Sequence, residues 1–450
     1  MPNLLADWLT YLESLHPKTI ALGLDRVAQV KQRLNLIPDF PIITVGGTNG
    51  KGSVCAMLES ILHAAGYRVG CYTSPHLLHY NERVRIAKKK ASDAELCASF
   101  ERIEQARKQQ VTVFNDPTPI LTFPLGRQER SSESVEVPLT YFEFGTLAAM
   151  QLFIEHKVDV AILEVGLGGR LDAVNMFDCD CAVVASVDID HTDYLGETRE
   201  QIAFEKAGIF RTGKVAVFGD RDMPAIFASE AQRIGAVLWS LGDQFGYKAS
   251  SAQQWDFNGV NGARNALPYP ALRGAYQLNN ASASLAVLDA LKDKLPVSMD
   301  AVRRGLVEVQ LAGRFQFVSG RPTLIMDVAH NPHAARSLAR NLTILPPCPH
   351  TYAVFAMLKD KDMAGVAAAL DPHIDTWLVA GISTPRGATA GALAHVLRQS
   401  GVRGTIQTFN NITEAVSYAY NVTGENDRIV AFGSFYTVAE VMYARGLSVT

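Results

Sequence analysis

The sequence lacks the features that mark secreted, membrane-spanning and nucleic-acid-binding proteins. Its six cysteines form no C-x-x-C pair, which favours reduced, structural thiols over disulfides, and over a metal site at Cys179-Asp180-Cys181. No stretch approaches the about 18 apolar residues of a membrane span, and the first residues lack a basic region before an apolar one. The net charge of −3 provides no basic surface for nucleic acid. We therefore expect a cytoplasmic protein without membrane or nucleic-acid partners.

The sequence does contain enough apolar material for a large core. Hydrophobic residues make up 48% of the 450 residues and charged residues 19%, and a chain of this length folds into two or three domains. Apolar segments of strand length alternate with segments of helical periodicity, a pattern typical of parallel sheets covered by helices. The sequence therefore predicts an α/β protein with a doubly wound, mainly parallel sheet.

A glycine-rich loop after the first predicted strand, residues 41–45, is the most informative local feature. Its residues are Gly47, Thr48, Asn49, Gly50, Lys51, Gly52 and Ser53, and a helical run over 54–65 follows. Glycines let backbone N–H groups approach an anion, a helix N-terminus attracts it, and Lys51 adds a charge. The loop departs from the usual P-loop because Gly52 separates Lys51 from Ser53. An ordinary glycine-rich turn is the alternative, but the order of these features favours a phosphate cradle for a nucleotide.

Two series of strands and helices divide the chain. In the first, strands are expected at 67–72, 158–165, 181–187, 214–218 and 237–240, and helices at 4–15, 24–36, 92–109, 141–156, 277–291 and 297–307. Residues 115–138, rich in proline, serine and charge, are expected to form a surface hairpin or a mobile flap. The rhythm then restarts with strands at 323–328, 351–355, 376–379 and 428–432 and a helix at 333–343. The predicted domains are residues 1–308 and 314–450, joined by a linker at 309–313.

Polar residues follow several predicted strands of the first series. Lys51 and Ser53 follow the first strand, Ser74 the second, and Glu164 and His191 stand at or after two later ones. In an open α/β sheet the carboxyl ends of the strands form the ligand-binding edge. Hydroxyl, carboxylate and imidazole groups can hold magnesium and leave positions for phosphate and water. Taken singly, these residues would be a turn serine, a strand-end carboxylate and a loop histidine; together they predict a magnesium–nucleotide site.

The loop G-T-N-G-K-G-S resembles that of the Mur ligase superfamily, and further motifs resemble those of the bacterial dihydrofolate synthase/folylpolyglutamate synthase family. These motifs are Thr73-Ser74-Pro75-His76-Leu77, Asn81-Glu82-Arg83, Glu164-Val165-Gly166-Leu167-Gly168-Gly169-Arg170-Leu171-Asp172-Ala173, Asp190-His191, Glu205-Lys206-Ala207-Gly208-Ile209, Gly313-Arg314-Phe315, Asp327-Val328-Ala329-His330-Asn331-Pro332, Lys359-Asp360-Lys361-Asp362 and Gly433-Ser434-Phe435. The resemblance spans nearly the whole chain. It implies a P-loop-containing N-terminal domain and a smaller C-terminal α/β domain that closes over ATP.

The resemblance implies a role for each matching residue. Lys51 would contact the phosphates, Ser74, Glu164 and His191 would bind two magnesium ions, and Lys206 would carry a carbamate that helps to position the second ion. Asn280 would contact adenine, Arg314 a phosphate, Asp327 the ribose or adenine, and His330 would lie near the γ phosphate. The segment around Asn280 departs from the superfamily, which often carries His-Asn where Tyr276-Gln277 stand. Without the resemblance, Lys206 would be interpreted as a lysine on a surface helix.

The implied function is that of an ATP-dependent amide ligase. The carboxylate of dihydropteroate or a reduced folate would attack the γ phosphate, and the amine of L-glutamate would displace phosphate from the acyl phosphate. We expect a monomer. The alternatives are a folylpolyglutamate synthase alone, another Mur-type ligase, or a nucleotide-binding switch that does not ligate. A switch would leave Lys206 and the second domain without a role.

Acceptance of dihydropteroate is expected from two segments. A pterin ring needs an aromatic face and polar partners at its edge. Phe142 could supply the face, and Thr140 and Asp172, followed by Ala173, the edge. In the family, bifunctional enzymes carry a similar pair of segments. The alternative is that Phe142 is a core residue of its helix and Asp172 a loop cap.

Overall fold

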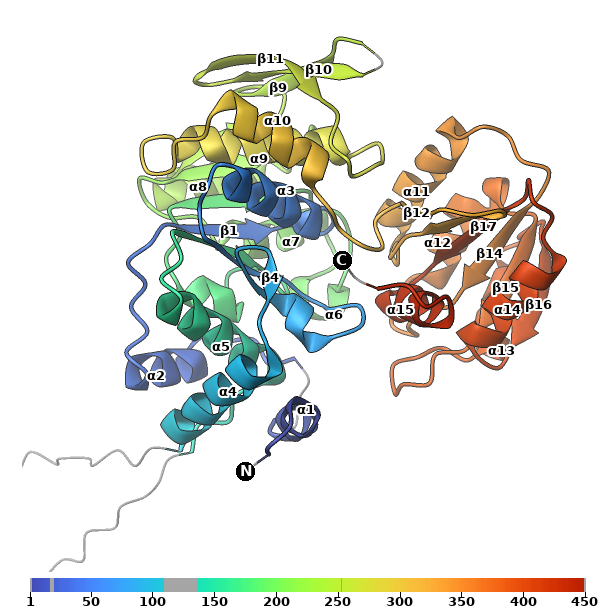
Figure 1. Ribbon diagram of the computed structural model, residues 1–450, viewed down its shortest axis with the longest axis horizontal. Helices are drawn as coiled ribbons and strands as arrows, with labels where there is room; N and C mark the ends of the chain where they lie inside the picture. The colour runs from blue at the N-terminus through green and yellow to red at the C-terminus, as the bar shows by residue number, and fades with distance from the viewer. Residues whose placement is uncertain (1, 17–19, 109–135, 252, 449–450) are drawn as a thin grey trace, which may run out of the picture.

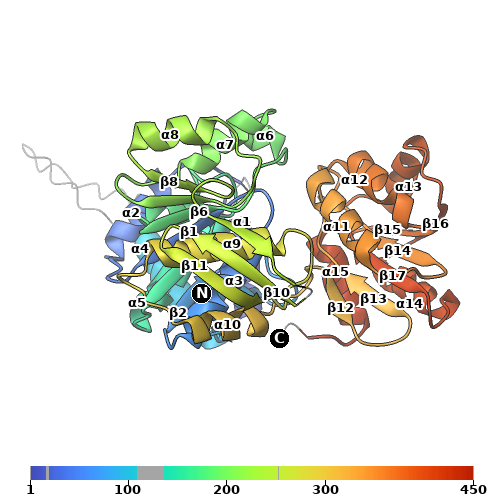
Figure 2. The same ribbon diagram turned by 90° about the horizontal axis from the view of Figure 1, so that it is seen from above.

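The protein consists of two α/β bodies that lie side by side (Figure 1). The computed structural model describes residues 2–16, 20–108, 136–251 and 253–448, so most of the stretch 115–138 lies outside the described residues. The larger body is built around an eight-stranded sheet and the smaller around a six-stranded sheet. Seen from above, the smaller body flanks one side of the larger (Figure 2). The predicted α/β class is confirmed.

The eight-stranded sheet is parallel except at one edge. Its order is β4-β3-β2-β5-β1-β6-β7-β8. The strands are β1 (Ile42–Gly46), β2 (Val69–Tyr72), β3 (Val84–Ile86), β4 (Lys89–Lys90), β5 (Val160–Glu164), β6 (Cys181–Val184), β7 (Val215–Phe218) and β8 (Val237–Ser240). Strands β3 and β4 were not predicted and pair antiparallel at the edge. Strands β1, β2, β5 and β6 are buried throughout, which is why they are continuous apolar runs in the sequence.

Helices cover both faces of this sheet. Side chains of α1 (Leu5–Ser14), α2 (Asp25–Arg33), α4 (Asp93–Arg107), α5 (Tyr141–Glu155), α7 (Arg199–Ala207) and α8 (Ile226–Ile234) pack in one core. The other core is made with α3 (Lys51–Ala64), α9 (Gln277–Ala290) and α10 (Met299–Glu308). A short helix, α6 (Thr192–Leu195), follows β6. The sheet is therefore doubly wound, as predicted.

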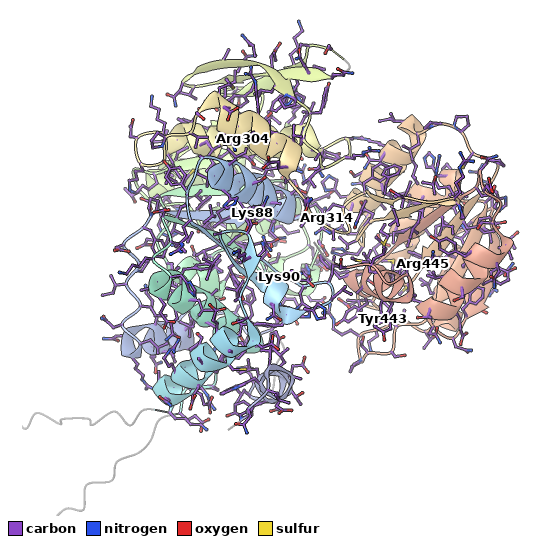
Figure 3. All side chains as sticks on the ribbon, in the orientation of Figure 1. Lys88, Lys90, Arg304, Arg314, Tyr443 and Arg445 are labelled. Carbon is purple, nitrogen blue, oxygen red and sulfur yellow. The ribbon has the colours of Figure 1, made fainter. Side chains whose placement is uncertain are left out.

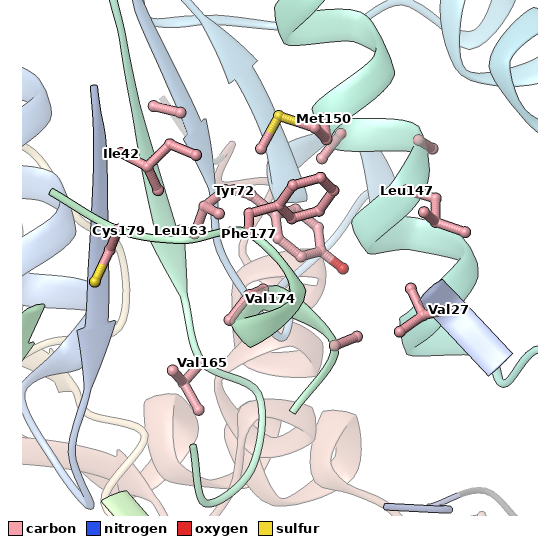
Figure 4. Packing of buried hydrophobic residues seen from close by; sticks show 14 of the residues in the cluster. Val27, Ile42, Tyr72, Leu147, Met150, Leu163, Val165, Val174, Phe177 and Cys179 are labelled. Carbon is pink, nitrogen blue, oxygen red and sulfur yellow. The ribbon is translucent and has the colours of Figure 1, made fainter. Parts of the chain in front are cut away.

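Large side chains fill the core beside the carboxyl end of β5 (Figure 4). Tyr72, Leu163 and Phe177 are each 1% exposed or less, and Leu147 and Met150 of α5 belong to the same cluster. Burying a side chain of this size stabilises the fold by about 1.5–3 kcal/mol. The end of β5, where Glu164 stands, is therefore held at a fixed position.

A three-stranded antiparallel sheet was not predicted from the sequence. It consists of β9 (Gly246–Ala249), β10 (Gln254–Gly259) and β11 (Gly262–Pro268), in the order β11-β10-β9. Trp255, Phe257 and Leu267 are fully buried in the core that also contains α9. Most other residues of these strands are polar or small, so the apolar signal is confined to isolated positions and is weak.

The smaller body contains the second sheet, in the order β12-β13-β17-β14-β15-β16. The strands are β12 (Gln316–Val318), β13 (Thr323–Met326), β14 (Thr351–Phe355), β15 (Thr376–Ala380), β16 (Thr405–Phe409) and β17 (Arg428–Phe432). The helices are α11 (Pro332–Ile344), α12 (Met363–Leu370), α13 (Ala390–Gln399), α14 (Ile412–Val422) and α15 (Phe435–Ala444). The strands at β12 and β16 and the helices α12 to α15 were not predicted; β16 is partly exposed and lacks a continuous apolar run.

The contact between α3 and α10 depends on one glycine. A Cβ atom on Gly305 would lie 2.4 Å from the Cα of Ile61, so the two helices would have to separate. We expect Gly305→Val to lower the free energy of unfolding by about 2 kcal/mol or more, because overpacking a close contact costs about 1–3 kcal/mol and valine gains little helix propensity. Chemical denaturation measures the change. Val307→Ala, at a 56% exposed position of the same helix, is the control, and equal stability of the two variants would contradict the prediction.

All six cysteines are free thiols, as expected. Within the described part of the chain, no helix is long and apolar enough to cross a membrane.

Candidate active site

A cavity of about 500 Å³ lies where the two bodies face each other. The larger body contributes the carboxyl edge of its parallel sheet. The smaller body contributes the segment before β12 and the segments after β13, β14 and β17. The lining includes these predicted site residues: Gly47, Thr48, Asn49, Gly50, Lys51, Gly52, Ser53, Ser74, Glu164, His191, Lys206, Asn280, Arg314, Asp327 and His330. Thr140, Phe142, Asp172 and Ala173 do not line it. The structure thus brings the predicted nucleotide and metal residues together and leaves the predicted pterin residues outside this cavity.

The glycine-rich loop ends in the first turn of α3, which begins at Lys51 rather than at the expected residue 54. Gly50 has a left-handed backbone (φ 88°), and a Cβ there would lie 2.7 Å from Asn280 Oδ1. A glycine is therefore required for both conformation and space. The Lys51 ammonium donates to the Gly47 and Thr48 carbonyl oxygens at 3.0 and 3.3 Å. The lysine thus folds back over its own loop, as a phosphate-binding lysine would need to.

Ser74 and Glu164 meet at the edge of the sheet. The backbone N–H of Ser74 donates to Glu164 Oε2 at 3.0 Å. Burial raises the pKa of Glu164, against the opposing effect of Lys51, because a carboxylate loses its hydration there. The Glu164 residue is 5% exposed, and the hydroxyl of Ser74 belongs to the neighbouring residue. Carboxylate and hydroxyl oxygens are the ligands that a hard divalent cation prefers. The residues present therefore fit a metal ion.

Lys206 lies on α7 and is 4% exposed, so it is not the surface lysine that its helix alone would suggest. Burial, and then repulsion from Lys51, lowers the pKa of Lys206 to about 7. A large share of this amine is therefore uncharged at neutral pH. Among the described residues, no three His, Cys, Asp or Glu side chains are grouped to hold a metal ion. A carbamate on Lys206 would provide a third metal ligand, in addition to the Glu164 carboxylate and the His191 imidazole.

His191 stands in a left-handed backbone conformation (φ 53°) at the start of α6. Its Nε2 atom is 3.2 Å from the ammonium of Lys361, a residue of the smaller body. Burial lowers the pKa of His191 to about 4, so the imidazole is neutral at pH 7 and can offer a lone pair. Lys361 also donates to Asp190 Oδ1 at 2.6 Å. The loop that carries His191 is thus in contact with the second body.

The smaller body supplies Arg314, Asp327 and His330. Arg314 lies between the two bodies (Figure 3), 5.1 Å from the ring centre of Phe435. Both oxygens of Asp327 accept backbone N–H groups at 2.8 Å, from Phe315 and from Ala329. Burial lowers the pKa of His330 to about 4, and its Nδ1 atom is 2.9 Å from the Val328 carbonyl oxygen. The imidazole is therefore neutral and oriented by its own loop.

Asn280 is linked to the cradle through side-chain amides. It donates to Gln277 Oε1 at 3.0 Å, and Gln277 donates to the Ser53 hydroxyl at 3.4 Å. On the same side, the Tyr276 and His333 rings meet edge to face at 5.4 Å. This wall has an aromatic residue and amides, which suit a flat heterocycle.

Several residues in or next to the cavity were not predicted as site residues. The side-chain amide of Asn49 in the larger body forms hydrogen bonds with two residues of the smaller body, Asn331 at 3.3 Å and His333 at 2.9 Å. Asn331 and Lys361 belong to family motifs in the sequence, but no role was predicted for either. Their position in a motif was the available signal; their partners, far away in the sequence, were not visible.

Of the four predicted pterin residues, Phe142 and Asp172 contact Gly166 and Leu167, which line the cavity. Thr140 caps α5, and Asp172 accepts from the N–H groups of Leu167 and Val174 at 2.8 and 3.1 Å. Phe142 packs against Gly166, where a Cβ would lie 2.7 Å from the ring. Burial raises the pKa of Asp172 to about 7. Ala173 is buried. A substrate role for these residues stays a prediction.

Two family models match the chain, the Mur ligase middle domain over residues 129–288 and the Mur ligase glutamate ligase domain over residues 313–435. Together with the glycine-rich cradle and the cavity between two α/β bodies, they define the protein as a Mur ligase. The dihydrofolate synthase/folylpolyglutamate synthase of Escherichia coli (strain K12) is 44% identical over 97% of this chain and 94% of its own length. The chain therefore belongs to the dihydrofolate synthase/folylpolyglutamate synthase family, and the predicted ATP-dependent amide ligase is confirmed.

Solved structures agree with this assignment. E. coli FolC in complex with DHPP and ADP has a TM-score of 0.88 and 43% identity, covering 99% of both chains. A bifunctional folylpolyglutamate synthase/dihydrofolate synthase with Mn, AMPPNP and L-glutamate bound has a TM-score of 0.85 and 44% identity, covering 99% of this chain and 98% of its own.

Proposed function

We propose that this ligase joins L-glutamate to dihydropteroate and to reduced folates, with ATP and two divalent metal ions. The observation that carries the proposal is the cavity in which Lys51, Ser74, Glu164 and His191 of one body face Arg314 and other residues of the second. The ligands of the solved relatives, DHPP, ADP, Mn, AMPPNP and L-glutamate, support the same substrates here.

The arrangement suits acyl-phosphate chemistry. The acceptor carboxylate attacks the γ phosphorus of ATP, which releases ADP, and the amine of glutamate then displaces phosphate from the acyl phosphate. Lys51 and Arg314 stabilise negative charge on the phosphoryl oxygens, which is often the largest contribution to such catalysis. Divalent ions, held by Ser74, Glu164 and His191, would supply further neutralisation of the phosphates. Closure of the two bodies excludes water that would hydrolyse the acyl phosphate.

Lys206 is proposed to carry a carbamate. A neutral amine can add carbon dioxide, and its depressed pKa makes the neutral form available at pH 7. The resulting anion would hold the second metal ion, whereas a lysine cation would repel it. Buried position and proximity to the cavity support this role.

The two bodies and the remaining site residues are proposed to have distinct roles. We propose residues 1–308 as the ATP-binding domain, 309–313 as the linker and 314–450 as the closing domain. Asn280 would contact adenine, Asp327 the ribose or adenine, and His330 would lie near the γ phosphate. A monomer contains all of these residues in one cavity, and we propose that the protein acts as a monomer in the cytoplasm.

Release of ADP tests the proposed function. We expect release to require both glutamate and an acceptor, and mass spectrometry to find the added glutamate on dihydropteroate and on a reduced folate. Release without glutamate or acceptor would favour a nucleotide-binding switch. Activity with reduced folate alone would leave a folylpolyglutamate synthase.

The Asp172→Ala variant tests the pterin assignment. We expect it to lose dihydropteroate ligation more than glutamate addition to a reduced folate, by about tenfold, because losing an edge contact to a pterin costs on the order of 1–2 kcal/mol. The measurement is kcat/KM for each acceptor. Since Asp172 also accepts a hydrogen bond from the Leu167 N–H and caps the short helix that begins at Ala173, the KM for ATP and the thermal midpoint serve as controls. Equal losses for the two acceptors would contradict a pterin contact and leave only the structural cap.

A further inference from the structure

Lys361 is a nearly buried lysine that has no assigned role and yet contacts the predicted metal site. It lies between β14 and α12 of the smaller body, in the cavity lining. Its ammonium is 2.6 Å from Asp190 Oδ1 and 3.2 Å from His191 Nε2, both on the larger body. The Lys361 and Asp190 side chains are 7% and 10% exposed. This is a cation held in low-dielectric surroundings across the two bodies.

Asp190 is the anchor of this contact. Asn331 donates to its other oxygen, Oδ2, at 3.0 Å, so both carboxylate oxygens are engaged by the smaller body. These contacts fix Asp190 against the smaller body and hold the Lys361 ammonium beside His191.

The contact with His191 has a chemical consequence. An ammonium carries donors and no acceptor, so the Nε2 atom facing Lys361 must offer its lone pair. A metal ion would use a lone pair of the same imidazole. If it uses Nε2, the ammonium and the metal ion exclude each other, because one lone pair cannot serve both and two cations repel at this distance.

We propose that Lys361 is a placeholder cation for the metal site. Before nucleotide binds, its ammonium occupies His191 Nε2; when metal arrives with the nucleotide, Lys361 leaves His191 and stays in the cavity through Asp190. This proposal rests on the proposed function, since it takes His191 as a metal ligand. If Lys361 acts in this way, the metal ion binds weakly in the absence of nucleotide. Metal ion and nucleotide then strengthen each other's binding, because the phosphates attract both the metal ion and the displaced Lys361 ammonium.

Mn²⁺ binding to the full-length protein tests the proposal. Free Mn²⁺ is measured by electron paramagnetic resonance with and without AMPPNP, for the unmodified protein and for Lys361→Met. We expect Lys361→Met to bind Mn²⁺ about tenfold or more tightly in the absence of nucleotide, and the enhancement of Mn²⁺ binding by AMPPNP to shrink by a similar factor. Lys359→Met removes the same charge from an exposed position of the same loop, and we expect it to change neither quantity.

Further variants separate the possible outcomes. Lys361→Arg keeps the charge and is expected to keep weak Mn²⁺ binding without nucleotide. If Lys361→Met does not fold, Lys361→Gln takes its place in the same measurement. Unchanged or weaker Mn²⁺ binding by the neutral variant, or an equal gain in Lys361→Arg, would overturn the proposal. Failure of the unmodified protein to bind Mn²⁺ even with AMPPNP would instead overturn the proposed metal site.

Discussion

Replacing Lys51 with alanine is expected to lower the turnover of the ligase by about 10²-fold or more. The Lys51 ammonium lies over the glycine-rich loop, within 3.0–3.3 Å of the Gly47 and Thr48 carbonyl oxygens. A phosphate in the loop would receive this charge directly. Without it, negative charge that develops on the phosphoryl oxygens during transfer would lose a fixed positive partner. ADP release at saturating ATP, glutamate and dihydropteroate measures the loss.

The Lys51→Ala variant is expected to unfold at the temperature of the unmodified protein, because the ammonium acts in the cavity and not in either core. Lys359→Ala removes a lysine from an exposed loop position and serves as the control, with unchanged turnover. Loss of cooperative unfolding in Lys51→Ala would contradict a role on phosphates. Retained turnover would contradict it as well.

Replacing Lys206 with alanine is expected to lower turnover by a similar factor, about 10²-fold, for a different reason. Burial lowers the pKa of Lys206 to about 7, so the neutral amine, which can add carbon dioxide, is available near neutral pH. Alanine would remove the proposed carbamate and, with it, the proposed ligand of the second metal ion. A small carboxylate such as formate can enter the space left by the side chain and restore part of the activity.

Two measurements separate a carbamate from a structural lysine. Labelled bicarbonate should give a carbamate resonance in the unmodified protein that is absent from Lys206→Ala. Formate should raise the activity of Lys206→Ala and leave that of Lys51→Ala unchanged, because only the former lacks a carboxylate. An unmodified lysine amine, together with no recovery in formate, would defeat the assignment.

The parts of the site that could be predicted from the sequence are local. A buried parallel strand, a glycine-rich turn and a helix with Lys51 at its start follow one another within a few residues, and the physics of anion binding is contained in that order. Glu164 could also be predicted from its local sequence, because it is a carboxylate at the end of an apolar run. The helix expected from residue 92 is likewise a local feature, and it begins with a capping box in which Ser92 and Glu95 form both hydrogen bonds.

Other features depended on distant contacts. The strands β9 to β11 have few apolar residues, and only packing of Trp255 and Phe257 against the core with α9 makes them a sheet. The structure alone shows that Phe142 lies against Gly166 and that Asp172 accepts a hydrogen bond from the N–H of Leu167; a pterin contact by either residue stays a prediction. Sequence spacing cannot distinguish a side chain that lines a cavity from one that supports its wall.

The sequence by itself determined that this protein has a phosphate cradle, two α/β series and the motifs of its family, because strand burial, helix periodicity and turn chemistry are properties of short segments. Only the tertiary structure decided that Lys206 is buried with a pKa of about 7, and that Lys361 reaches Asp190 across 171 residues of chain. Burial and charge pairing of this kind arise when two separately built bodies meet, and the residues that meet carry no mutual signal in the order of the chain.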